Sequence, residues 1–194
     1  MKIVYIFLIL LILPTKVIAL KLTKLNVDLN YPWGMTWVSS DKLLITEKKS
    51  HEIILIDTSN NTYQKIDHNL PIKGDRQGGL LDIISEDNNI WITGSIQKEN
   101  GYTTAVFKSK LENNKLVDSQ LIFEALPYIP NQVHFGSRMT IKGEHLFVSI
   151  GERGKGMIAQ DASMHPGSII RIHLDGSIPK DNPRFKSKSK WLPE

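Results

Sequence analysis

The chain has 194 residues, a formal net charge of +4 and no cysteine. The absence of cysteine excludes a disulfide framework and a thiolate metal site, and so small a charge gives no reason to expect nucleic acid as a partner. A hydrophobic share of 41% is ordinary for a globular protein of one or two domains.

The first 19 residues have the pattern of a secretory signal peptide. Lys2 is followed by an apolar run from Ile3 to Leu13, and Ala19 ends a sequence suited to cleavage. The run is shorter than the about 20 residues that a membrane-spanning helix needs; an uncleaved anchor is the alternative. We expect residues 1–19 to be removed, leaving residues 20–194 as a periplasmic or secreted protein with no stable membrane span.

The rest of the sequence predicts strands and turns, because no window of 12 residues keeps a helical period. Three strands each open on a glycine, at Gly34, Gly79 and Gly136, and two further strands follow each of them. These further strands are expected at residues 43–46 and 53–57, 90–93 and 104–107, and 146–149 and 168–172.

The opening glycines stand 45 and 57 residues apart, and repeats of several strands at such a spacing are typical of β-propeller blades. A glycine at each strand start suits a close approach of two backbones. We therefore predict an all-β chain with about three to four blades of a β-propeller, too few to close a ring. A β-sandwich of about nine strands is the alternative, and the unequal loops argue against it.

A histidine and a glutamate are the first candidates for chemistry. His134 precedes the strand predicted at 136–141 and Glu152 follows the strand at 146–150, so they meet if these strands are antiparallel neighbours. A carboxylate beside an imidazole fixes its tautomer and makes it a directed base. The alternatives are a structural histidine and a surface ion pair of Glu152 with Arg153 or Lys155.

Further polar residues are expected at the same end of the blades. Gln77 holds the place in its blade that the candidate histidine holds in the later one, and its amide can bind a sugar hydroxyl or a carbonyl; a plain turn residue is the alternative. Arg138 is close in sequence to the histidine, and Gln160, Asp161 and Asp82 are weaker candidates. The spacing of histidines and carboxylates predicts no metal site.

Nine segments that cover almost everything after residue 19 match one family in order: 32–35, 44–47, 77–82, 134–138, 151–154, 159–161, 167–171, 175–179 and 181–183. Together they resemble the soluble glucose/sorbosone dehydrogenase family, the quinoprotein aldose sugar dehydrogenases that use pyrroloquinoline quinone (PQQ). The resemblance implies a six-bladed propeller and an oxidoreductase that converts the anomeric carbon of aldoses to a lactone, with hydride passing to PQQ.

The resemblance also implies roles for single residues. His134 would take the proton of the sugar's anomeric hydroxyl, and Gln77 would lie beside the substrate and the cofactor. Glu152 stands where the family usually has an aspartate, which keeps the charge and lengthens the arm by one methylene. In the family, the groups that hold the PQQ carboxylates and a Ca²⁺ ion come after the position of Glu194. We therefore expect the N-terminal half of such an enzyme, a truncated or partial chain that is inactive alone.

Two other functions stay open at this point. One is a non-catalytic propeller module that binds a sugar or a protein. The other is a propeller sugar lactonase, in which a bound calcium ion activates water. The expected partner is a small-molecule sugar, together with an electron acceptor that the sequence leaves open.

Overall fold

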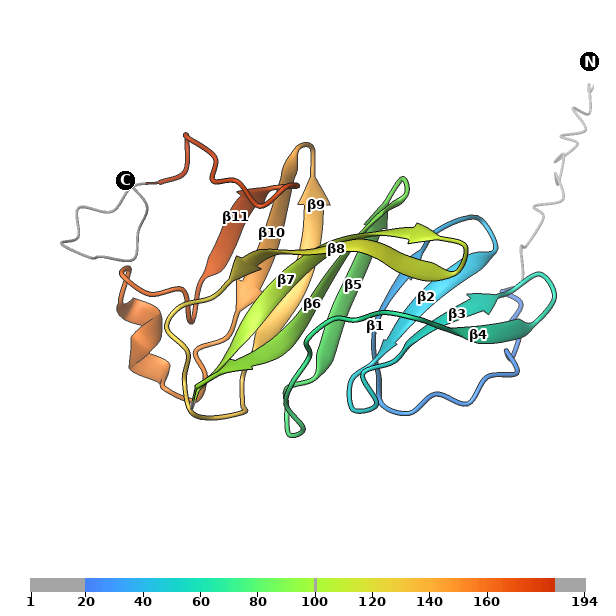
Figure 1. Cartoon of the computed structure of the whole chain (residues 1–194), viewed down its shortest axis with the longest axis horizontal. Coiled ribbons are helices and arrows are strands. Elements are labelled where there is room, and N and C mark those ends of the chain that lie inside the picture. Colours follow the sequence, from blue (N-terminus) through green and yellow to red (C-terminus); the bar gives the residue numbers. More distant parts are fainter. Residues whose placement is uncertain (1–19, 100, 184–194) are drawn as a thin grey trace, which may run out of the picture.

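The protein is described by a computed structural model for residues 20–99 and 101–183, so the expected signal peptide at 1–19 lies outside the described residues. Within these two ranges the chain forms eleven strands and one short 3₁₀ helix, η1 (Gly156–Gln160). The strands make three antiparallel sheets that follow one another in chain order (Figure 1). No helix in the described ranges is long and apolar enough to cross a membrane.

Each sheet is a meander in which every strand pairs with the next one along the chain. The first sheet holds β1 (Pro32–Trp37), β2 (Lys42–Glu47), β3 (Ile53–Asp57) and β4 (Thr62–Ile66). The second holds β5 (Leu80–Glu86), β6 (Asn89–Lys98), β7 (Gly101–Glu112) and β8 (Lys115–Glu124). The third holds β9 (Gly136–Lys142), β10 (His145–Ile150) and β11 (Ile169–His173).

The predicted repeat is confirmed, because β1, β5 and β9 each begin a sheet. Strand β5 starts directly after Gly79 and β9 starts at Gly136, whereas β1 starts at Pro32, two residues before Gly34. The fold is all-β and consists of three β-propeller blades, and the described blades do not close a ring. The β-sandwich alternative is not what forms, because the strands make three sheets in sequence rather than two packed face to face. The fourth strands, β4 and β8, were not predicted.

Apolar side chains of alternate residues build the contacts between neighbouring blades. Along β6, Ile90 and Ile92 belong to the buried cluster shared with the first sheet, whereas Trp91 belongs to the cluster shared with the third. Successive side chains of a strand point to opposite faces of a sheet, so a strand buried on both faces reads as a continuous apolar run. The middle blade is therefore packed on both sides.

Two of the opening glycines are required by close backbone contacts. A Cβ atom on Gly79, which has φ +120°, would lie 2.0 Å from the carbonyl oxygen of Lys48. A Cβ atom on Gly136, which has φ +73°, would lie 2.6 Å from the backbone nitrogen of Gly151. Only glycine accepts these positions without strain, as expected where strands of neighbouring segments converge.

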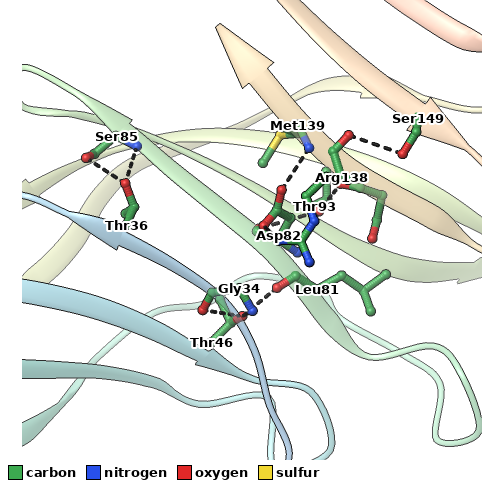
Figure 2. A network of polar contacts seen from close by, with 11 residues as sticks. Gly34, Thr36, Thr46, Leu81, Asp82, Ser85, Thr93, Arg138, Met139 and Ser149 are labelled. Atoms are coloured by element: carbon green, nitrogen blue, oxygen red, sulfur yellow. Dashed lines mark hydrogen bonds and ion pairs between the residues drawn. The ribbon is translucent and has the colours of Figure 1, made fainter. Parts of the chain in front are cut away.

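Polar contacts also join the blades near the start of β5 (Figure 2). The Thr46 hydroxyl on β2 donates to the carbonyl oxygen of Leu81 at 2.5 Å. On the other side, the buried carboxylate of Asp82 accepts the backbone N–H of Met139 in β9 at 2.7 Å. The second blade is thus fixed to both neighbours, which sets the position of the loop that precedes β9.

Candidate active site

His134 lies in the loop before β9, and its backbone is held by a residue of the preceding blade. The N–H of His134 donates to Oε1 of Gln77 at 2.8 Å, and the N–H of Gln77 donates to the carbonyl oxygen of Gln132 at 3.1 Å. The imidazole is half exposed, at 51%. His134 and Gln77 therefore lie side by side, with the side-chain amide oxygen of Gln77 bound to the backbone N–H of His134.

His134 and Glu152 are in contact, as the two-strand argument predicts. Strands β9 and β10 are antiparallel, and Ile150 at the end of β10 pairs with Gly136 at the start of β9. Across this end, Nδ1 of His134 forms a hydrogen bond with Oε1 of Glu152. Hydrogen bonding to His134 is the largest cause that lowers the pKa of the Glu152 carboxyl below its ordinary value.

The pair determines what the imidazole can do. An ionised carboxylate only accepts hydrogen bonds, so Nδ1 carries the proton and Nε2 of the neutral ring is left as a proton acceptor. Glu152 also accepts the N–H of Gly154 at 3.1 Å, which fixes the carboxylate in place. The geometry is that of an oriented general base, in which the carboxylate stabilises the imidazolium once a proton is taken up.

The loop before β9 and the segment after β10 meet at His134 and Glu152, here called the His134 corner. Three of the eleven non-glycine residues with positive φ in the described part of the chain lie in or directly beside these segments: His134, Ser137 and Arg153, at 48°, 86° and 60°. Such conformations cost free energy in residues with a side chain and cluster at functional sites. Ser137 is fully buried, and its hydroxyl is one of two buried side-chain groups without a hydrogen-bond partner in the described part of the chain.

Arg138 is held by a residue of the neighbouring blade. Its Nη1 donates to Oδ1 of Asp82 at 2.6 Å, across the boundary between the second and third blades (Figure 2). The Arg138 side chain is 64% exposed, whereas that of Asp82 is 2% exposed. The buried carboxylate therefore anchors a guanidinium that remains open to solvent.

Gln160 and Asp161 are not brought into contact with the His134 corner by any described hydrogen bond. Gln160 is exposed at the end of η1. The carboxylate of Asp161 accepts the hydroxyl of Ser163 and, at 2.9 Å, its backbone N–H, as in an ordinary turn. These contacts, the hydroxyl first, lower the pKa of Asp161. Their predicted role in binding remains a prediction.

Arg153 is a part of this site that was not predicted. It was expected at the surface as a partner of Glu152, but its side chain is buried, at 1% exposure. None of the ion pairs among the described residues involves it, and its guanidinium donates to backbone carbonyl oxygens instead. A Gly-Glu-Arg-Gly segment carries no signal that would predict this burial.

Comparison with known proteins gives the family. The sequence profile described as Glucose / Sorbosone dehydrogenase matches residues 29–193. An uncharacterised protein of Synechocystis, slr1608, is 33% identical over 195 residues, covering 86% of this chain and 46% of the relative. The aldose sugar dehydrogenase YliI of Escherichia coli is 26% identical over 167 residues, covering 81% of this chain and 45% of that protein.

Solved structures agree in fold. The soluble aldose sugar dehydrogenase from Escherichia coli in the apo-form superposes with a TM-score of 0.75 at 27% identity, covering 82% of this chain and 49% of that one. The PQQ-bound aldose sugar dehydrogenase from Streptomyces coelicolor gives a TM-score of 0.72 at 20% identity, covering 81% and 48%.

The fold is thus that of the solved aldose sugar dehydrogenases. The chain belongs to the glucose/sorbosone dehydrogenase family. It spans about half the length of the curated relatives and solved structures it matches.

Proposed function

We propose that this chain supplies the general base, and the carboxylate that orients it, in the active site of an aldose dehydrogenase that uses PQQ. The observation that carries the proposal is the contact of His134 Nδ1 with Glu152 Oε1, which leaves Nε2 as the proton acceptor. The family profile and the names of the relatives support a sugar as the substrate. The PQQ-bound neighbour supports the choice of cofactor.

The residues of this chain would act on the anomeric C–OH group of the sugar. Nε2 of His134 takes the hydroxyl proton while the hydride leaves C1, and the sugar becomes a lactone. PQQ, when bound, supplies the two-electron acceptor for that hydride. Glu152 stabilises the imidazolium, and Gln77 holds the backbone of His134 so that the ring keeps its direction.

The described residues fit one part of a PQQ site. PQQ carries three carboxylates, which require concentrated positive charge or a metal ion. Near the His134 corner the exposed guanidinium of Arg138 is available, although Asp82 shares its charge, and Arg76 is also exposed. The guanidinium of Arg153 is bound to carbonyl oxygens. Arg138 is therefore the cation we assign to PQQ or to the substrate.

Calcium has no evident set of ligands in the described part of the chain. No group of three or more histidine, aspartate or glutamate side chains within residues 20–99 and 101–183 is arranged to hold a metal ion. We propose that the 194-residue chain by itself binds PQQ weakly and oxidises no sugar, because few cations face the corner. Fluorescence quenching on titration with PQQ measures this, and micromolar or tighter affinity contradicts it.

The proposed activity is tested on protein produced from the complete reading frame. The purified protein, loaded with PQQ and Ca²⁺, is mixed with glucose, galactose or xylose, and the reduction of a dye acceptor and the formation of lactone are measured. We expect lactone in step with dye reduction, and none when PQQ is omitted. Dye reduction without lactone, or sugar binding without oxidation, contradicts the proposal and favours a binding module.

We further propose that the protein works outside the cytoplasm, on the signal pattern at residues 1–19. N-terminal sequencing of the protein from a periplasmic or culture fraction should begin at Leu20. An N-terminus at Met1 in a membrane fraction contradicts the expected cleavage.

A further inference from the structure

Arg153 is a buried cation that lies next to Glu152 in the chain and is not bound to it. Each of its three guanidinium nitrogens donates to a different backbone carbonyl oxygen: Nε to Val133 at 3.0 Å, Nη1 to Tyr102 at 2.9 Å, and Nη2 to Asn131 at 2.6 Å. Burial lowers the pKa of Arg153 to about 10, so the side chain is still charged at neutral pH. A buried charge is costly unless its hydrogen bonds are satisfied, and here they are satisfied by carbonyl groups.

These carbonyl groups belong to two separate parts of the fold. Asn131 and Val133 belong to the loop that carries His134, whereas Tyr102 lies on β7 of the second blade. The guanidinium also lies over the ring of Phe135, at 3.8 Å from the ring centre. Arg153 therefore ties the residues on both sides of His134 to each other and to the neighbouring blade.

The backbone of the same segment adds contacts on either side of Glu152. The N–H of Gly151 donates to the carbonyl oxygen of Phe135 at 3.0 Å, and that of Arg153 donates to the carbonyl oxygen of His134 at 3.3 Å. A Cβ atom on Gly151 would lie 1.9 Å from the carbonyl oxygen of His134, so the two chains are as close as backbones allow. Glu152 thus lies between Gly151 and Arg153, which both form hydrogen bonds with the loop that carries His134.

From this arrangement we propose that Arg153 is a positioning residue, whose planar guanidinium holds His134 in the orientation in which Glu152 reaches Nδ1. The inference rests on the proposed role of His134 as base. Arginine suits this task and lysine does not, because a guanidinium presents its donors in a rigid planar fork whereas an ammonium group is a single point charge. The strained φ of 48° at His134 is kept by these contacts.

The test compares Arg153→Lys with a matched control, Arg171→Lys. Arg171 is paired with Asp181 on the third blade, away from the His134 corner. For Arg153→Lys we expect kcat to fall by about tenfold or more, as a small misplacement of a base does, with KM within about twofold. For Arg171→Lys we expect unchanged kcat and KM. Thermal unfolding of both variants shows that the loss does not come from unfolded protein.

A second measurement does not need turnover. The carboxyl carbon of Glu152 is followed by ¹³C NMR as pH is varied in the full chain. Because hydrogen bonding to His134 lowers the Glu152 pKa, loosening the pair in Arg153→Lys should move the titration of Glu152 upward, and Arg171→Lys should not move it. An unchanged titration of Glu152 in Arg153→Lys overturns the inference, even if kcat falls.

The two readouts also separate this inference from the proposed function. If the wild-type protein oxidises no sugar but Arg153→Lys still shifts Glu152, the positioning of the pair stands and the proposed reaction fails. If Arg153→Lys does not fold, Phe135→Leu serves as the second variant, since it removes the ring beneath the guanidinium and leaves its hydrogen bonds. The Glu152 titration should again move upward, and an unmoved titration overturns the inference.

Discussion

His134 and Glu152 stand 18 residues apart in the chain and form a hydrogen bond between Nδ1 and Oε1 at the joined ends of β9 and β10. One hairpin therefore supplies both the proposed base and the carboxylate in contact with it. The pair explains why the chain can hold one imidazole nitrogen protonated and the other free.

Replacing Glu152 by Gln should lower kcat by about 10- to 100-fold with little change in KM. The amide still offers an oxygen to Nδ1 but no longer stabilises the imidazolium. Steady-state kinetics on the PQQ-loaded protein measure the effect. The matched control is Lys155→Gln, an exposed neighbour, and the account is wrong about Glu152 if both variants behave alike.

The stability of the protein should depend on Glu152 in a defined pH range. The folded-state pKa of Glu152 is lowered, so its contribution is present above the unfolded pKa of about 4.3 and is lost as pH falls through the folded value. The free energies of unfolding of wild type and Glu152→Gln, measured in urea, should differ at pH 6, and the difference should shrink as the pH falls below about 4.3. A difference that grows on acidification contradicts this sign.

Removing the Asp82 side chain should lower the free energy of unfolding by more than the loss of its single ion pair. Its buried carboxylate accepts from Arg138 at 2.6 Å and from the backbone of Met139 at 2.7 Å. Asp82→Ala should lower the free energy of unfolding by about 1–3 kcal/mol, because a buried N–H loses its partner. Arg138→Ala should cost less, since that side chain is largely in solvent and the Met139 contact survives. Urea denaturation measures the free energy of unfolding of both variants. A larger loss for Arg138→Ala than for Asp82→Ala would contradict this explanation.

Ser137→Gly should stabilise the protein. Ser137 has φ 86° and a buried hydroxyl without a partner among the described residues. Glycine removes both penalties, and we expect a gain of about 1 kcal/mol, seen as a rise in Tm of about 2–4 °C. Ser137→Ala separates the two causes because it removes only the hydroxyl. A lower Tm for Ser137→Gly would show that the hydroxyl has a role that these contacts do not reveal.

The order of the blades and the His134–Glu152 contact could be predicted from sequence because both are local. A glycine lies at or near the start of each blade, and an antiparallel hairpin brings the ends of its two strands together. The fourth strands were missed for a physical reason. Strand β4 is exposed at four of its five residues, and β8 has a non-glycine residue with positive φ, Asp118, with register shifts beside it. Neither shows the apolar alternation that marks a strand.

The positions of Arg138 and Arg153 could not be predicted in the same way. Arg138 is paired with a residue 56 positions earlier in the chain, and Arg153 reaches a carbonyl group 51 positions earlier. Both contacts cross from the third blade to the second, so they depend on how two blades pack. Sequence spacing within one blade carries no signal for them.

The central claim is that His134 is the base, and one comparison tests it most directly. Lactone formation from a saturating aldose is measured for wild type, for His134→Gln, and for His145→Gln as a matched control on the third blade, each made from the complete reading frame and loaded with PQQ and Ca²⁺. We expect His134→Gln to lose at least about 100-fold in kcat, while His145→Gln keeps the wild-type rate and both variants remain folded at the assay temperature. Wild-type lactone formation by folded His134→Gln would contradict this claim.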